Sequence, residues 1–107
     1  MRERRGGMWV VPGVNEEPVV TLSRWTVREL SSTGTRHFVG YNMVENEGRV
    51  SSAIVDYDTE TKMGTTSSGR VYELYGQPGY NGDAEYVWER WSKGAEYKDV
   101  TDEYYSP

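Results

Sequence analysis

One stretch of the chain, residues 83–93, carries its hydrophobic residues at helical spacing. Positions i, i+3, i+4 and i+7 are apolar, which is the pattern of one side of an α-helix: Ala84, Val87, Trp88 and Trp91. Asp83 at the beginning suits the positive end of the helix dipole, and Lys93 with Gly94 suits the other end. We therefore expect a helix over this stretch, with both tryptophans packed against a sheet.

The residues before this helix alternate between apolar and polar positions in a way typical of β-strands. Strands are predicted over residues 19–30, 36–43, 49–57 and 70–75, with polar or glycine-containing turns between them. The third of these is apolar on both faces, which favours a central position in the sheet. The turns are short, so strands that follow one another in the chain are expected to be neighbours.

The alternation changes phase inside the first predicted strand. Val20 and Leu22 occupy even positions, whereas Trp25 and Val27 occupy odd positions. A β-bulge near Ser23–Arg24 would reconcile the two halves, because one extra residue turns the following side chains to the other face.

Together these elements predict an α+β fold: a three- to four-stranded antiparallel meander sheet with one C-terminal helix packed on one face. We expect residues 1–7 to be a disordered leader and residues 8–94 to form a single α+β domain. Residues 95–107 are acidic and rich in tyrosine. They are expected to form an extended tail that docks partly through Tyr97 or Val100.

The composition excludes several classes of site. The chain has no cysteine, so it has no disulfides, thiolate zinc sites or cysteine nucleophiles. It shows neither the apolar run of a secretory signal nor the roughly 20 apolar residues that span a bilayer. We therefore expect no membrane association, and a cytoplasmic protein is the simplest interpretation.

The charge balance bears on the kind of partner. The chain has a formal net charge of -5, from 17 acidic and 12 basic residues. Three of the basic residues but only one acidic residue lie in positions 1–7, so the remainder is more acidic still. An acidic surface repels a phosphate backbone, which disfavours direct nucleic-acid binding and favours a basic protein partner. The plain alternative is that the charge only keeps the protein soluble.

His37 is the only histidine and the one candidate general base. None of the serines lies in a G-x-S-x-G context that would mark a nucleophile. A histidine packed among aromatic residues of a strand is therefore the favoured interpretation, and we predict a protein that is not an enzyme. An enzyme with His37 as base stays as a weaker hypothesis.

Two motifs partly match ligand sites. Asp56, Asp58 and Glu60 have the spacing of the first ligands of a calcium loop, but Thr61 and Ser67 stand where that loop needs glycine and glutamate.

The second motif is residues 76–82, which are rich in glycine and precede the helix, where a phosphate-binding loop would lie. The lysine of such loops is missing, and Asp83 places a negative charge at the anion position. We expect neither a metal nor a cofactor.

Five arginines of the predicted strands raise an alternative function: Arg24, Arg28, Arg36, Arg49 and Arg70. On one face, with tyrosines between them, they would resemble the sheet platforms that stack single-stranded bases. Cross-strand pairing with Glu29 and Glu73 is the structural alternative.

The candidate partner-binding surface consists of six acidic residues of the helix and the tail: Glu85, Glu89, Glu96, Asp99, Asp102 and Glu103. Glu85 and Glu89 are four residues apart on a helix, where like charges repel and cost some stability. Such a cost favours docking to a basic protein surface, through an attraction that salt weakens. A solvated helix face is the plain alternative.

The segment Gly69-Arg-Val-Tyr-Glu-Leu-Tyr-Gly-Gln-Pro-Gly79, followed by Asp83-Ala-Glu-Tyr-Val-Trp88, resembles small proteins of unknown function encoded by bacteriophages and prophages. The resemblance extends over the block from Trp25 to Trp91. Small acidic phage proteins are often inhibitors of host defence, anti-CRISPR proteins among them. The resemblance therefore implies an inhibitor encoded by a mobile element, and it assigns no role to any residue.

The preferred hypothesis is a non-enzymatic acidic binding module that inhibits or modulates a basic, nucleic-acid-handling host protein complex. The alternative is a single-stranded nucleic-acid-binding protein that uses the strand arginines and tyrosines. An unpaired edge strand or an exposed Trp9 would also permit a homodimer.

Overall fold

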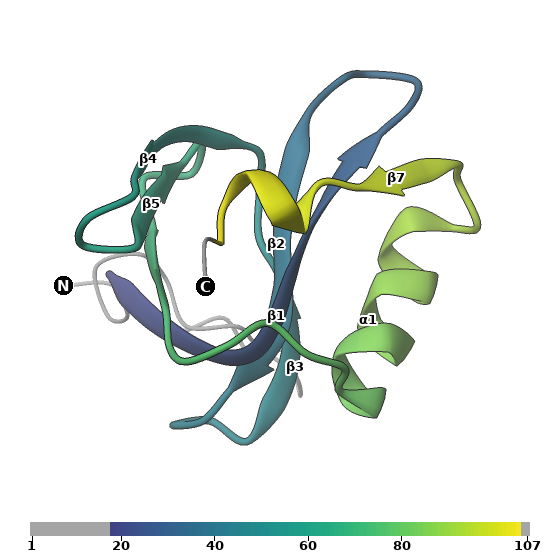
Figure 1. Ribbon diagram of the computed structural model, residues 1–107. Coiled ribbons are helices and arrows are strands. Elements are labelled where there is room, and N and C mark those ends of the chain that lie inside the picture. Colours follow the sequence, from purple (N-terminus) through teal and green to yellow (C-terminus); the bar gives the residue numbers. More distant parts are fainter. Residues whose placement is uncertain (1–17, 106–107) are drawn as a thin grey trace, which may run out of the picture.

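A computed structural model describes residues 18–105, which form a sheet of seven strands, one α-helix and a short 3-10 helix (Figure 1). The elements are β1 (Val19–Leu30), β2 (Arg36–Asn42), β3 (Glu47–Val50), β4 (Ile54–Asp58), β5 (Met63–Thr66), β6 (Val71–Leu74), α1 (Gly82–Ser92), β7 (Tyr97–Asp99) and the 3-10 helix η1 (Thr101–Glu103). The predicted leader, residues 1–7, lies outside the described residues.

The sheet is larger than the predicted meander and differs from it in direction. Its strands are ordered β3-β2-β1-β6-β5-β4, and β7 pairs with the end of β1. β1 and β6 run parallel, whereas the other pairs are antiparallel. The α+β class is confirmed, but the prediction of three or four antiparallel strands is wrong. It failed because β6 returns to β1 from far along the chain, and no short turn marks such a pairing.

β1 is the longest strand and carries the bulge that the phase change predicted. Its register with β2 shifts between Ser23 and Thr26, and Arg24 between them has a φ of 47°. The side chains before and after the bulge lie in the same buried cluster: Val20, Leu22, Trp25 and Val27. The predicted bulge is therefore confirmed.

The prediction of one central strand over residues 49–57 is wrong. The chain bends after β3, which pairs with β2, and only then enters β4, which pairs with β5. In the bend, the buried Ser51 hydroxyl accepts from the Phe38 N–H at 2.9 Å and donates to the Ser52 carbonyl at 2.7 Å. These bonds hold the chain in a turn, so β3 and β4 lie at opposite ends of the strand order.

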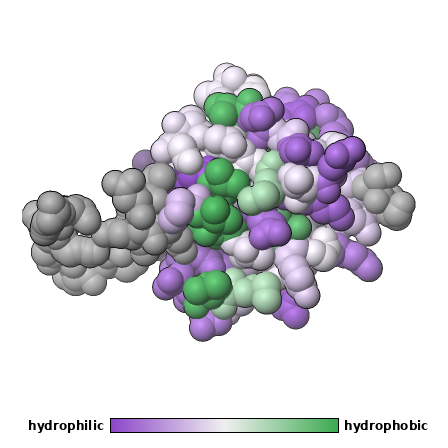
Figure 2. Space-filling model, turned by 90° about the vertical axis from the view of Figure 1, so that its left-hand side faces the viewer, coloured by the Kyte–Doolittle hydropathy of each residue, from purple (hydrophilic) through white to green (hydrophobic). Residues whose placement is uncertain are grey.

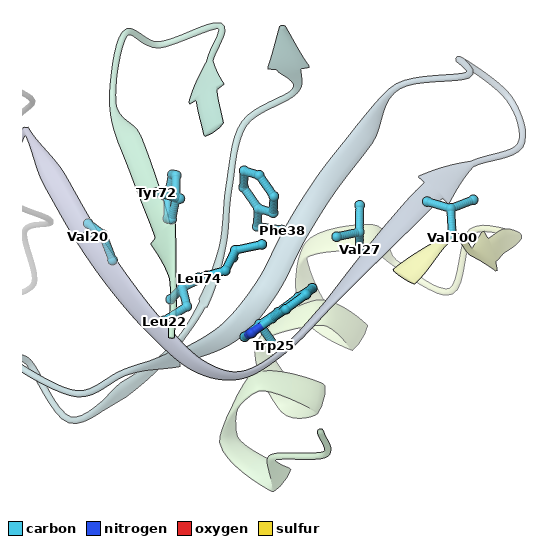
Figure 3. Close-up of a cluster of buried hydrophobic side chains, with 8 residues drawn as sticks. All are labelled: Val20, Leu22, Trp25, Val27, Phe38, Tyr72, Leu74 and Val100. Carbon is cyan, nitrogen blue, oxygen red and sulfur yellow. The ribbon is translucent and has the colours of Figure 1, made fainter. Parts of the chain in front are cut away.

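The larger hydrophobic cluster, here called the main core, contains eight buried residues (Figure 3): Val20, Leu22, Trp25, Val27, Phe38, Tyr72, Leu74 and Val100. The sheet curls around it, and β5 passes so close to β2 that a Cβ on Gly64 would overlap the ring of Phe38. Tyr104 and Tyr105 pack against the same cluster from the C-terminal side. Residues from β1, β2, β6 and the segment after β7 therefore share one core.

The segment that the sequence presents as a tail is joined to β1. β7 pairs with the end of that strand, and the buried Val100 donates its N–H to the Val27 carbonyl at 2.8 Å. Thr101 is also buried, and its hydroxyl accepts from the Val27 N–H at 3.0 Å. The expected docking through Val100 is present.

α1 packs on the other face of β2 and β3, over a smaller group here called the helix-side cluster: Val39, Ala84 and Trp88. The helix begins after Asn81, whose backbone is extended. The Asn81 side chain caps the helix by accepting from the Ala84 N–H at 2.9 Å. Asp83 lies inside the first turn and is not the cap. Lys93 and Gly94 end the helix with φ values of 55° and 76°.

Figure 2 shows the face on the left of Figure 1, where β4 and β5 lie. Hydrophobic residues on this face form separate groups among hydrophilic ones. In the described part of the chain, no helix has the length and apolar character needed to cross a membrane.

Candidate functional site

A cavity of about 620 Å³ lies between α1 and β3, and we call it the helix–strand cavity. Its volume is within the range of about 300–1,000 Å³ that is usual for ligand sites. The helix contributes Asp83, Tyr86, Val87 and Trp91, β3 and the residue before it contribute residues 46–50, and the remaining wall is formed by Ser52, Ser68, Arg70 and Tyr72.

Gly48 sets the position of the helix against the strand. A Cβ at this glycine would overlap the backbone of Asp83 and Ala84, so the first turn of α1 approaches β3 only because Gly48 has no side chain. This contact fixes one end of α1, and the next turns of the helix form the wall of the cavity.

Trp91 is an exposed member of the aromatic group under α1. The sequence predicts that Trp88 and Trp91 are both buried, and this holds for Trp88, which is 1% exposed. Trp91 is 42% exposed because one side of it faces the helix–strand cavity. Its ring centroid lies 4.7 Å from that of His37 and 5.5 Å from that of Trp88. The exposed indole is therefore held in place by two other rings.

Tyr86 is the second exposed aromatic residue on the cavity wall. Arg90, one helical turn later, donates a hydrogen bond to its hydroxyl at 3.2 Å, and the guanidinium carbon lies 5.5 Å from the ring centroid. This pair is exposed and adds little stability, but it keeps the tyrosine ring along the helix surface.

The charged residues of the cavity differ in their access to solvent. Arg49 and Arg70 are buried, and Arg49 donates to the Glu47 carboxylate at 3.4 Å. The Glu47 side chain is 45% exposed, and Asp83 is exposed at the start of the helix. Among the lining residues, the charges accessible to solvent are therefore carboxylates.

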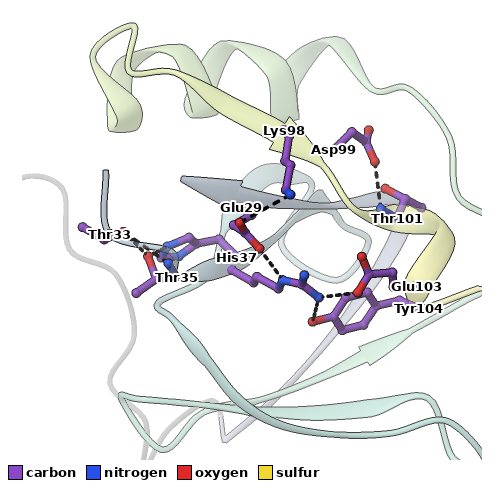
Figure 4. Close-up of polar contacts among 10 residues, drawn as sticks. Glu29, Thr33, Thr35, His37, Lys98, Asp99, Thr101, Glu103 and Tyr104 are labelled. Carbon is purple, nitrogen blue, oxygen red and sulfur yellow. Dashed lines mark hydrogen bonds and ion pairs between the residues drawn. The ribbon is translucent and has the colours of Figure 1, made fainter. Parts of the chain in front are cut away.

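His37, the candidate base, is buried beneath Trp91. Its Nδ1 donates to the Ser51 carbonyl at 2.9 Å, and its Nε2 lies 2.8 Å from the Thr35 hydroxyl (Figure 4). Burial lowers the pKa of this imidazole, and the bond to Ser51 only partly opposes that shift. Within the described residues, the two ring nitrogens therefore contact a hydroxyl and a carbonyl, as in a histidine packed inside a fold.

Three of the six predicted partner-binding acids are used inside the fold. Glu85 forms an ion pair with the buried Arg28, and Glu103 pairs with Arg36 at 2.8 Å. The Asp99 carboxylate accepts from the N–H of Thr101 at 2.8 Å at the start of η1 (Figure 4).

The other three acids are exposed and have no ion pair or side-chain hydrogen bond within residues 18–105: Glu89, Glu96 and Asp102. Glu89 belongs to α1, on the helix-side cluster, whereas Asp102 belongs to η1, next to the main core. The six acids are therefore divided between two faces and do not form one surface.

The strand arginines do not form a base-stacking platform. Arg28 is buried under α1, where its guanidinium carbon lies 5.2 Å from the Trp88 ring centroid and 5.1 Å from that of Tyr97.

Arg36 lies on the opposite face, and its hydrogen bonds to Tyr104, Glu103 and Glu29 raise its pKa (Figure 4). Arg24, at the bulge, is exposed. The predicted arginines are thus distributed over different faces and degrees of burial.

The two partial ligand motifs both have structural contacts. The Asp58 carboxylate accepts from the N–H groups of Glu60 and Thr61, at 2.8 and 3.3 Å, and holds the turn between β4 and β5. Residues 18–105 contain no group of three or more His, Cys, Asp or Glu residues placed to hold a metal ion.

The glycine-rich loop of residues 76–82 is attached to the main core. The Gly76 carbonyl accepts from the Trp25 indole N–H at 3.2 Å, and the Gly79 N–H donates to the Trp25 carbonyl, also at 3.2 Å. The loop therefore serves as the crossover from β6 to α1.

The fold and the cavity define the class of this protein: an α+β domain with an open, acid-rimmed cavity beneath its single described helix. Comparison of the chain with protein-family models, curated proteins and solved structures found no match.

Sequence reasoning missed the cavity itself. It identified Trp91 but placed it in the core, and it assigned no role to Tyr86, Ser52 or Ser68. The pair Tyr86 and Arg90, four residues apart on one helix face, was a readable signal. The two serines carry no such signal, because they reach the cavity only through the bend after β3 and the turn after β5.

Proposed function

We propose that this protein is a non-enzymatic binding module that docks a basic protein surface onto the exposed side of α1 and the rim of the helix–strand cavity. The observation that carries the proposal is the state of Trp91, which is 42% exposed yet in contact with the rings of His37 and Trp88. Aromatic side chains that are rigid before binding lose little conformational entropy on contact, and tryptophan is enriched among the residues that dominate interface energies.

The charge of the molecule supports a basic partner. The chain has a net charge of -5, Asp83 and Glu47 are solvent-accessible acids that line the cavity, and Glu89 is exposed elsewhere on α1. Opposite charge accelerates association and disfavours acidic competitors. Proteins that handle nucleic acids carry basic surfaces, so we propose a partner of that class, in line with the inhibitor role that the phage resemblance implies.

The proposed contact surface is narrower than the six acids of the sequence pattern. It keeps Glu89 and Glu96 on the helix side, adds Tyr86 and Trp91, and leaves out Asp102, which lies by the main core. Glu85 also contributes little to it, because its carboxylate is engaged by Arg28.

The test uses the immobilised full chain and bacterial proteins that elute from a heparin column, a fraction rich in basic nucleic-acid-binding proteins. We expect Trp91→Ala to weaken retention of the partner by at least about 2 kcal/mol, or roughly 30-fold. Tyr80→Ala is the matched control, because Tyr80 is exposed but does not line the cavity. Added salt and Glu89→Lys should also weaken binding.

The proposal would be contradicted if Trp91→Ala and the wild type retained the partner equally and circular dichroism showed both proteins to be folded. So would a complex whose affinity does not change with salt concentration.

A further inference from the structure

We propose that the partner enters the helix–strand cavity as an extended, basic segment that adds a strand to β3, at the edge that pairs with no other strand of residues 18–105. This inference rests on the proposed function and specifies the form in which the partner is recognised. Addition of a strand to a sheet edge is a common way for a domain to bind a peptide, because main-chain hydrogen bonds supply affinity and alternate side-chain pockets supply selectivity.

The first support is the position of β3 in the sheet. Within residues 18–105 it pairs with β2 on one side and with no strand on the other. In an antiparallel pair, alternate residues direct their N–H and C=O groups away from the partner strand. All four residues of β3 line the cavity, so the outward backbone groups of this strand border it.

The second support is the shape and chemistry of the walls. Four residues of β3 extend over about 13 Å, which matches a short partner strand. Side chains of such a strand alternate in direction. One set would meet the apolar wall of α1, formed by Val87 and Trp91, and the other set would meet the hydroxyl groups of Ser52 and Ser68.

The third support is the charge at the rim. Glu47 and Asp83 are the solvent-accessible charges among the lining residues, while Arg49 and Arg70 are buried. A segment that carries lysine or arginine beside apolar residues meets opposite charges as it enters. An acidic segment is repelled at the same place.

The experiment selects peptides of about 12 random residues, long enough to exceed the β3 edge, from a display library on the full chain. We expect the enriched sequences to alternate apolar residues with lysine or arginine. In a protein labelled with nitrogen-15, the selected peptides should shift the amide signals of residues 47–50.

Strand addition has a readout that other modes of binding lack. N-methylation of a peptide residue removes its backbone donor and blocks pairing at that residue. At the alternate residues whose N–H groups face β3, it should weaken binding at least about tenfold. At the residues between them, whose N–H groups face away from β3, the same modification should leave affinity unchanged. Trp91→Ala should weaken peptide binding more than Trp91→Phe, and Tyr80→Ala should have no effect.

An acidic consensus, no enriched peptide, or amide shifts that avoid residues 47–50 would overturn the inference. The proposed function would still hold if the heparin-retained partner kept its dependence on Trp91, so the two failures are distinguishable. Displacement of the selected peptides by a synthetic peptide of residues 1–17 would assign the cavity to the chain's own first residues and also overturn the inference.

Discussion

The two faces of the sheet are built differently. The main core contains eight buried hydrophobic residues and is closed by tyrosines. The helix-side cluster has three buried hydrophobic residues, and beside them lie the Arg28–Glu85 ion pair and the exposed ring of Trp91. One face is therefore dominated by apolar burial, whereas the other combines a small apolar contact with charged and solvent-exposed groups.

This difference separates the residues that stabilise the fold from those of the proposed binding surface. Apolar burial contributes roughly 25 cal/mol per Å², whereas a buried ion pair recovers little beyond the cost of removing its charges from water. The main core should therefore dominate the free energy of unfolding. The helix side carries less of it and can present Tyr86 and Trp91 to a partner without exposing the core.

Loss of the largest side chain of the main core should have the largest effect. Trp25→Ala removes a fully buried indole and its hydrogen bond to the Gly76 carbonyl, and we expect a loss of about 3–5 kcal/mol in the free energy of unfolding. Urea unfolding followed by circular dichroism measures it. Trp25→Phe, which keeps a ring, should lose less, and a cost below about 1 kcal/mol for the alanine variant would contradict this ranking of the two faces.

Gly48→Ala should rank next, because its new Cβ overlaps helix backbone that cannot rotate away. We expect about 2–3 kcal/mol of destabilisation, together with a changed Trp91 environment as α1 moves. Gly64→Ala is the matched variant on the other face, where the overlap is with the ring of Phe38. It should destabilise the protein without weakening partner binding, and equal effects of both variants on binding would contradict the separation.

The ion pair beneath α1 gives a smaller effect. Glu85→Ala leaves the buried Arg28 without its carboxylate and should cost about 2 kcal/mol. The double variant Arg28→Met, Glu85→Ala should recover most of that loss, since it removes the buried charge as well. A double-variant cycle by urea unfolding measures both, and a purely additive result would show that the pair is not coupled.

His37 should produce the smallest effect, as a dependence of stability on pH. Its pKa in the folded protein is below the ordinary value of 6.5, so the unfolded chain binds the proton more readily. This contribution is full above about pH 6.5 and is lost as the pH falls toward the folded-state pKa. His37→Gln should flatten the change in the urea midpoint between about pH 7 and about pH 5.5, and an unchanged profile would contradict it.

Local signals in the sequence predicted the elements whose contacts are nearby in the chain. The change of phase between Leu22 and Trp25 located the bulge in β1, and the spacing of Ala84 and Trp88 located the helix face. The sequence does not settle which residue caps the helix, because Asn81 and Asp83 are both suitable, and only the extended backbone of Asn81 distinguishes them.

The errors concern pairings between distant residues. The parallel pair of β1 and β6 has no connecting turn to mark it, and β7 is three exposed residues without an alternating pattern. The break after β3 had one signal, the pair Ser51–Ser52, since serine side chains often bond to nearby backbone. The cavity could not be predicted, because it depends on where these distant segments meet.

The arrangement of β1 bears on how the chain folds during synthesis. This strand is made early, yet one of its sides is shared between β6 and β7, and the last of these neighbours ends at Asp99. During translation, the backbone N–H and C=O groups at the end of β1 that pair with β7 therefore stay unpaired until almost all of the described chain has been made. Chains that stop before Val100 should therefore be substrates for chaperones and proteases, however complete their first hairpin.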